Sequence, residues 1–319
     1  NLNKIIIMPS NPYYSLYEDN FIVTKSSPEK ENFDVLVFCR RNVETIVIPD
    51  FIEIIGPYAF NNCKKLQQVE FAENSNLRII SKCAFSGSSI NFFKIQPSLV
   101  KICEFAFFTC YELKMIELPN NTNLQIIENG AFASTSALFE INETKSSNSS
   151  NFNSIFTVYD NKFILGKSSP DKEFFDKLVL SVRNIDIVEI PDFIEIIGNF
   201  AFCHCLNIKE IKFSGDSKLR IIENFAISTT SISTFSVPCH LIEIGKNAFS
   251  YSDNFKRIEI PQNSELQIIE KNAFSWTPIE NLSIPSNLVD LKKGWCLDTP
   301  QLTDITVNPN NQIYIYLDN

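Results

Sequence analysis

The fold is decided by residues Pro49 to Cys63, PDFIEIIGPYAFNNC, because the pattern of this stretch returns along the chain. Its first eight residues, PDFIEIIG, recur unchanged at Pro191 to Gly198, 142 positions later. The pattern consists of an apolar residue, two spacers, an Ile, three spacers and an Ala-Phe pair, and it can be traced nine times. Recurrence at a short fixed period predicts a solenoid of stacked repeats.

The Ala-Phe pair anchors each repeat. It stands at residues 59–60, 84–85, 106–107, 131–132, 201–202, 248–249 and 273–274, and it becomes Ala-Ile at 226–227 and Trp-Cys at 295–296. An Ile or Leu lies four residues before every anchor and another lies seven before, as Ile55 and Ile52 do in the first repeat. Neither position has a polar exception, so we expect both, together with the anchor, to form the core.

Upstream of each anchor lies a short segment in which apolar and polar residues alternate, as in a half-buried strand. These segments start at residues 43, 66, 90 and 113, and again at 185, 208, 232, 255, 279 and 302, which gives a period of 23–24 residues. Several end in proline, which cannot donate to a sheet ladder and therefore fits the strand end. One such unit cannot enclose its apolar face, but stacked units share a continuous core.

The arrangement LxxIxxxxxxLxxIxxxAFxxCxxL resembles the BspA-like, or Treponema-type, leucine-rich repeat, and the resemblance covers nearly the whole chain. It implies a repeat solenoid with a curved parallel β-sheet on one face and short helical or irregular segments on the other. Family members are mostly bacterial and protist cell-surface proteins implicated in adhesion. The resemblance therefore implies a cell-surface or extracellular location, with a cytoplasmic one as the alternative.

Two inserts interrupt the repeats, at residues 13–41 and 137–184. Phe163-Ile164-Leu165 in the second insert matches Phe21-Ile22-Val23 in the first, and the sequence KSSP follows in both. We expect each insert to form a strand pair. The domain prediction is one solenoid over residues 1–319, duplicated as blocks 1–142 and 143–301 and cut within the array at both ends. The polar stretch 145–151 is expected to be a mobile surface loop.

Composition and charge disfavour several classes of function. The net charge is −9 and the pI is about 4.9, whereas nucleic acids and anionic membranes attract basic surfaces. Only two histidines occur, His204 and His240, and no acid–base group or phosphate-binding loop stands out. We therefore expect no enzyme, no cofactor, no small-molecule substrate and no membrane contact by this part of the chain.

Nine cysteines raise the question of disulfides or metal. Cys63, Cys110 and Cys205 follow their anchor by four residues, where other repeats carry Ser or Thr, so we expect small buried residues there. The odd total argues against a complete disulfide set. Cys203-His204-Cys205 lacks the CxxC spacing typical of zinc sites, and we expect no metal.

Four N-glycosylation sequons begin at Asn120, Asn142, Asn148 and Asn281. They mildly favour a secreted context. We expect Asn142 and Asn148, in the polar loop, to be the accessible ones.

The candidate binding surface is the outward side of the predicted strands, because alternate strand residues point away from the core. Its two columns of side chains are mixed and change from repeat to repeat. Phe92 and Met115, expected to be exposed and rimmed by charge, have the composition of an interface hot spot. The predicted partner-binding residues are Gln68, Glu70, Phe92, Lys94, Met115, Glu117, Glu189, Glu210, Lys212, Arg257 and Glu259.

The leading functional hypothesis is a non-enzymatic adhesion module that binds host matrix or another cell's protein through this strand face. The alternatives are a structural spacer and an intracellular protein–protein interaction scaffold. A binding module loses its ligand when the strand face is substituted, whereas a spacer tolerates every such change.

Overall fold

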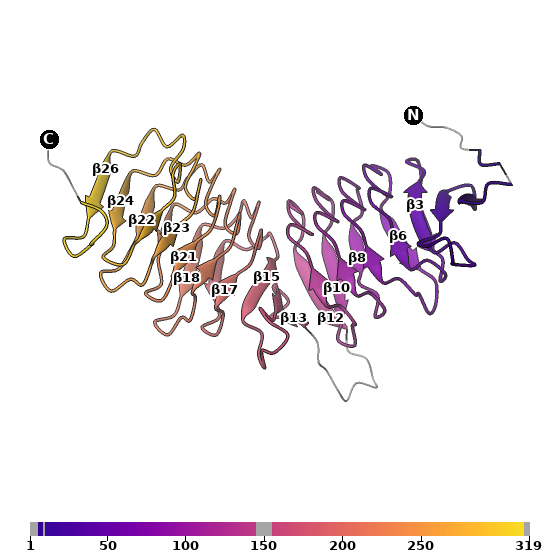
Figure 1. Cartoon of the computed structure of the whole chain (residues 1–319), viewed down its shortest axis with the longest axis horizontal. Coiled ribbons are helices and arrows are strands. Elements are labelled where there is room, and N and C mark those ends of the chain that lie inside the picture. The colour runs from indigo at the N-terminus through magenta and orange to yellow at the C-terminus, as the bar shows by residue number, and fades with distance from the viewer. Residues whose placement is uncertain (1–5, 9, 145–154, 316–319) are drawn as a thin grey trace. The chain divides into compact units, whose positions relative to one another are not determined.

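The computed structural model describes residues 6–8, 10–144 and 155–315. It divides into two compact units, residues 1–162 (unit 1) and 163–319 (unit 2), and each is described by itself. Each unit is built from coils stacked side by side (Figure 1). A coil contains a longer strand, a turn, a two-residue strand and the Ala-Phe turn. Whether the two units form one continuous solenoid stays a prediction.

The longer strands form parallel sheets, which we call the face ladder, as the alternating segments predict. In unit 1 they are β4 (Thr45–Ile48), β6 (Gln68–Phe71), β8 (Phe92–Lys94), β10 (Met115–Pro119) and β12 (Glu140–Thr144). In unit 2 they are β16 (Ile187–Ile190), β18 (Glu210–Phe213), β20 (Thr234–Ser236), β22 (Arg257–Glu259), β24 (Asn281–Ile284) and β26 (Asp304–Val307). Each ladder is split into two sheets, between β6 and β8 in unit 1 and between β18 and β20 in unit 2.

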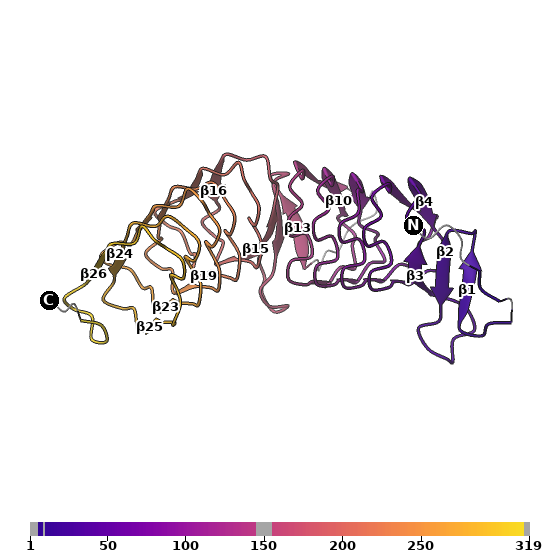
Figure 2. The ribbon, with the colours of Figure 1, turned by 90° about the horizontal axis from the view of Figure 1, so that it is seen from above.

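The two-residue strands form a second parallel ladder, the back ladder, which the alternating segments do not reveal. In unit 1 these strands are β5 (Ile54–Ile55), β7 (Ile79–Ile80), β9 (Lys101–Ile102) and β11 (Ile126–Ile127). In unit 2 they are β17 (Ile196–Ile197), β19 (Ile221–Ile222), β21 (Glu243–Ile244), β23 (Ile268–Ile269) and β25 (Asp290–Leu291). Figure 2 shows that the two ladders of unit 2 run along opposite sides of its coils.

The expectation of short helical segments is wrong, because the described residues contain no helix. The Ala-Phe segment is instead a turn whose backbone bonds the next coil: Phe60 N donates to Ala84 O at 2.7 Å, and Phe85 N to Ala106 O at 2.8 Å. Donors used between coils are not available for the i→i−4 bonds of a helix. Each turn has left-handed residues one before and three after the Ala position, namely residues 58, 62, 83, 87, 105, 109, 130, 134, 200, 204, 225, 229, 247, 251, 272, 276, 294 and 298.

Within the described residues the structure contains no helix long and apolar enough to cross a membrane.

The Ala-Phe anchors lie in the core, as predicted, and are at most 3% exposed from Ala59 to Phe274. In unit 1 the phenylalanine rings stack along the array: the Phe60 and Phe85 centroids are 4.7 Å apart with planes at 6°, and Phe107 and Phe132 are 4.9 Å apart at 7°. Such ring pairs contribute about 0.5–1.5 kcal/mol beyond their burial. Each coil therefore depends on its neighbours for part of its stability.

Each insert contains an antiparallel strand pair, as predicted, but the first also has a third strand, and the second also includes β12 of the face ladder. In unit 1, β1 (Tyr14–Tyr17) pairs with β2 (Phe21–Thr24), which pairs with β3 (Val35–Cys39). In unit 2, β14 (Phe163–Gly166) pairs with β15 (Lys177–Ser181). The remaining strand, β13 (Phe156–Tyr159), belongs to unit 1. Strands β3 and β15 also pair in parallel with β5 and β17, so each insert supplies the first parallel strand of its back ladder.

A buried carboxylate fixes each insert loop. Asp34, 3% exposed, accepts hydrogen bonds from Ser26 N at 2.7 Å and lies 2.8 Å from Lys30 Nζ. Asp176, fully buried, occupies the equivalent place, with Ser168 N at 2.7 Å and Lys172 Nζ at 3.1 Å. The Asp34 carbonyl oxygen also accepts a bond from the backbone N–H of Glu53 at 2.9 Å. The loop is thereby attached to the first coil.

Candidate functional site

The outward positions of the face ladder form the candidate site. In β4, Ile46 and Ile48 are buried while Thr45 and Val47 point outward, and the same alternation holds in β6 and β16. All eleven predicted partner-binding residues occupy such outward positions. Phe92, Met115 and Glu117 are half-buried, and the exposed ones are Gln68, Glu70, Lys94, Glu189, Glu210, Lys212, Arg257 and Glu259.

Unit 1 brings four of the predicted residues together. Met115 lies directly opposite Phe92 in the β8–β10 register, and Glu117 opposite Lys94. Lys94 Nζ is 3.2 Å from Glu117 Oε1. We call this group, with Asn142, the Phe92 patch. Its two apolar side chains stand in one row and its ion pair in the next, so an apolar centre lies beside a charged border.

Phe92 and Met115 are less exposed than expected. The register sets Glu140 beside Met115, and Asn142 Nδ2 lies 3.4 Å from the Met115 sulfur, so β12 covers part of Met115. Met115 in turn lies beside Phe92. Asn142 also donates to Glu140 Oε1 at 2.9 Å. Alternation shows which way a side chain points, but its exposure depends on what the adjacent strand places next to it.

The other two predicted residues of unit 1 belong to the separate β4–β6 sheet. Gln68 Nε2 donates to Glu70 Oε1 at 2.8 Å, and Val47 lies opposite Glu70. Val47 is 49% exposed, which makes it an apolar member of the face that the sequence analysis did not select. Val47 could have been recognised from the sequence, because it is an apolar residue at an outward position of its strand.

Unit 2 carries a more polar face. Glu189 lies opposite Lys212 in the β16–β18 register, and Lys212 Nζ is 3.6 Å from Glu210 Oε2. Arg257 and Glu259 stand on β22, where Ser236 Oγ donates to Glu259 Oε2 at 2.7 Å. The unselected Ile187, 47% exposed, is paired in register with Glu210.

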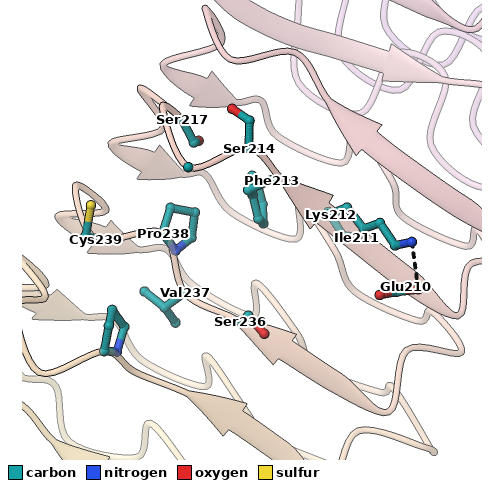
Figure 3. Close-up of a pocket in the computed structure, with 12 residues that line it drawn as sticks. Glu210, Ile211, Lys212, Phe213, Ser214, Ser217, Ser236, Val237, Pro238 and Cys239 are labelled. Carbon is teal, nitrogen blue, oxygen red and sulfur yellow. Dashed lines mark ion pairs between the residues drawn. The ribbon is translucent and has the colours of Figure 1, made fainter.

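A groove opens in unit 2 where the face ladder is split between β18 and β20 (Figure 3). Its volume is about 480 Å³, and Phe213, Val237 and Pro238 supply apolar surface. Ser214, Ser217 and Ser236 add hydroxyl groups, and the predicted residues Glu210 and Lys212 line one end. The groove thus combines apolar area with a few hydrogen-bonding groups.

The sequons fall in different surroundings. Asn142 is a half-buried residue of β12, so its expected place in the polar loop is wrong; the strand extends to Thr144 because it pairs with β10 to Pro119. Asn281 is half-buried in β24 opposite Asp304. Asn120 is half-buried and donates its backbone N–H to Thr144 O at 3.0 Å. Asn148 and the stretch 145–151 lie outside the described residues.

The cysteine column is buried, as expected. Cys63, Cys110 and Cys205 are completely buried, and Cys110 Sγ donates to Phe85 O at 3.1 Å. Burial raises the pKa of Cys110 to about 12, so its thiol stays protonated. Burial also lowers the pKa of His204, which occupies a left-handed turn position. Among the described residues no group of His, Cys, Asp and Glu is arranged to hold a metal ion.

Two exposed aromatic side chains on the Ala-Phe turns of unit 2 are not among the predicted partner-binding residues. Tyr251 and Trp276 are each 51% exposed, and their rings stack with centroids 6.1 Å apart and planes at 9°. They occupy the second left-handed column, where the other coils have Asn62, Gly87, Thr109, Ser134, His204, Thr229 and Asp298. A large aromatic residue in a column that elsewhere holds smaller or more polar residues is the signal that marks them.

The stacked coils, with two parallel ladders and a repeated Ala-Phe turn, define a leucine-rich-repeat β-solenoid. The family described as "BspA type Leucine rich repeat region" matches residues 32–158 and 175–313, with six copies. The chain belongs to this family. No curated protein matches it in sequence.

Solved structures of bacterial proteins share the fold. A leucine-rich cell surface protein of Faecalibacterium prausnitzii is 18% identical, with a TM-score of 0.56 over 96% of both chains. A leucine-rich-repeat protein of Eubacterium ventriosum is 14% identical, with a TM-score of 0.67 over 92% of this chain and 82% of the other. The pneumococcal vaccine antigen PcpA is 20% identical, with a TM-score of 0.53 over 84% of this chain and 62% of its own.

Proposed function

We propose that this chain is a non-enzymatic protein-binding module of a cell-surface protein and that it binds its partner through the face ladder. The observation that carries the proposal is the Phe92 patch, where the register sets Phe92 beside Met115 and the Lys94–Glu117 ion pair next to them. Apolar anchors bordered by charge dominate the energy of many protein interfaces. A host-matrix or cell-surface protein is the proposed partner.

Rigidity supports the same proposal. The outward side chains stand on strands whose inward neighbours, such as Phe93 and Ile116, are completely buried. A face held by the core loses little conformational entropy when a partner binds, which favours affinity. A surface location is supported by the family and by the description of the F. prausnitzii structure as a cell surface protein.

The test compares the two units at equivalent positions. Phe92 and Thr234 are 142 positions apart and open strands β8 and β20. The full chain, labelled with a fluorophore, is incubated with an array of extracellular matrix and cell-surface proteins, and the affinity for any captured protein is measured. We expect Phe92→Asp to weaken binding at least tenfold, about 1.4 kcal/mol, and Thr234→Asp to leave it unchanged.

Circular dichroism and the unfolding midpoint check that Phe92→Asp is folded, because its half-buried ring contributes to stability. A captured protein that binds the parent, Phe92→Asp and Met115→Lys equally well contradicts the proposed face. If the chain captures no protein from the array but still holds a fused domain away from a surface, the result supports the spacer instead. Binding confined to cytosolic proteins supports the intracellular scaffold.

A further inference from the structure

Two thiols meet where the first insert joins the first coil. Cys39 ends β3 and Cys63 follows the first Ala-Phe turn; both are completely buried. The backbone joins the two segments, because Cys39 N donates to Ala59 O at 3.0 Å, four residues before Cys63. The Cys39 sulfur donates to Arg40 O at 3.4 Å. At the equivalent place 142 positions later, Ser181 Oγ and Cys205 Sγ both donate to Val182 O, at 3.0 and 3.8 Å. Side chains 39 and 63 are thus directed at one carbonyl group.

An arginine lies beside one of these thiols. Arg41 Nη1 donates to Cys63 Sγ at 3.1 Å, to Cys39 O at 3.0 Å and to Ala59 O at 2.9 Å. The Arg41 guanidinium thus contacts both cysteines, at the carbonyl oxygen of Cys39 and at the sulfur of Cys63.

The second block of the chain repeats this site with one thiol fewer. Arg183 Nη1 donates to Cys205 Sγ at 2.9 Å and to Ala201 O at 2.9 Å, as Arg41 does 142 positions earlier. The residue equivalent to Cys39 is Ser181, whose Oγ donates to Val182 O at 3.0 Å. The arginine and the buried cysteine thus pack without a second sulfur. Packing does not require a thiol at position 39.

We propose that Cys39 and Cys63 form an intramolecular disulfide bond that ties the end of β3 to the first Ala-Phe turn. With a low-molecular-weight disulfide as the oxidant, the thiolate of one of the two cysteines attacks one of its sulfurs and releases a small thiolate. The other cysteine then loses its proton to water, and its sulfur attacks the protein sulfur of the mixed disulfide and releases the second small thiolate. The two protein thiols are oxidised and the oxidant is reduced to two thiols.

The burial of both sulfur atoms determines when the disulfide can form. Neither sulfur is exposed in the folded chain, so the exchange takes place while the chain folds, before the core closes. The bond restricts the unfolded chain between residues 39 and 63, which stabilises the folded state. It also attaches the insert covalently to the coil that the Asp34 loop holds by hydrogen bonds and an ion pair.

The experiment refolds the full chain from denaturant with oxidised and reduced glutathione, blocks remaining thiols with iodoacetamide and maps peptides by mass spectrometry. We expect a cross-linked Cys39–Cys63 peptide and seven blocked cysteines, nine minus the bonded pair. The oxidised parent should unfold at a higher temperature than its reduced form. In Cys39→Ser, which reproduces the second block, no cross-link should form and the midpoint should not depend on redox conditions.

Ser181→Cys supplies the reciprocal test, since it places a thiol beside Cys205 in an equivalent arginine site. We expect this variant to gain a second cross-link, at Cys205, and a further rise in its unfolding midpoint. Nine blocked cysteines in the folded, refolded parent would overturn the proposal. Cross-links scattered over other cysteines would overturn it equally.

Discussion

The rings of Phe85 and Phe107 stack with centroids 5.1 Å apart and planes at 4°, so two coils 22 residues apart share one aromatic layer. Phe107 continues the stack to Phe132 and also meets Phe93 edge-on at 4.7 Å. It therefore touches the coil before it and the coil after it. Its removal should affect more than its own coil.

Phe107→Ala should lower the free energy of unfolding by about 3–5 kcal/mol, because it removes a fully buried ring and leaves a cavity. Phe108→Ala is the matched control, since that adjacent ring is 36% exposed; its cost should be much smaller. Urea denaturation measures both. Hydrogen exchange should show lost protection in the coils on both sides of Phe107. Equal losses in the two variants would contradict the stacked core.

Acid should loosen the insert loops through Asp34 and Asp176. Burial by itself raises the pKa of each carboxyl, but hydrogen bonds from Ser26 or Ser168 and the adjacent Lys30 or Lys172 outweigh it, so both pKa values are lowered. A lowered pKa adds stability that is fully present above the unfolded value of 3.8 and is lost as pH falls through the folded value. We expect the parent to lose stability below about pH 4.

The variant Asp34→Asn/Asp176→Asn checks this assignment. At pH 7 it should be less stable by about 1–3 kcal/mol for each buried carboxylate removed. Its unfolding midpoint should fall less than the parent's between pH 5 and pH 2. Parallel curves for the two proteins over that range would assign the acid sensitivity to other groups. Circular dichroism melts at several pH values supply the data.

The Lys94–Glu117 ion pair should matter little for folding. The side chains are 49% and 18% exposed, and pairs open to solvent contribute about 0.2–1 kcal/mol. Lys94→Ala, Glu117→Ala and the double variant should therefore unfold within about 1 kcal/mol of the parent. A double-mutant cycle on chemical denaturation measures the coupling. A coupling above about 2 kcal/mol would mean that the pair holds the coils together rather than facing a partner.

The core was predictable because each buried position returns in every coil. Ile55, Ala59 and Phe60 are apolar, are repeated in register and are completely buried. The expectation of short helical segments comes from the family resemblance, which implies helical or irregular segments without deciding between them. The left-handed residues Tyr58, Cys83 and Phe105 share no chemistry that distinguishes the turn. Hydrogen bonds from one coil to the next impose their conformation, and those bonds are not visible in one repeat.

The sequence predicts which way the side chains of the candidate site point, but not how far each of them is exposed. Period-two alternation placed Phe92, Lys94 and Glu117 on the outward side. The partial burial of Phe92 and Met115 depends on which side chains the adjacent strands set beside them. The split between β18 and β20, which opens the groove, depends on backbone pairing rather than on residue type.

Gly130 occupies a turn position that has no room for a larger side chain. Its φ of 65° is left-handed, and a Cβ at this position would overlap the Phe105 ring of the preceding coil. Phe105 itself has a φ of 57°, so a side chain is tolerated in this column and the ring is the additional obstacle. Gly130→Ala should lower the free energy of unfolding by about 1–3 kcal/mol.

Gly215→Ala is the control for this substitution, because nothing lies within 4 Å of its added Cβ and its φ is not left-handed. It should leave stability unchanged or raise it by about 0.4–1 kcal/mol, through the smaller conformational entropy of the unfolded chain. Urea denaturation of both variants gives the comparison. A Gly130→Ala protein as stable as the parent would show that the Phe105 ring moves aside freely, and that the packing between these two turns is looser than the structure indicates.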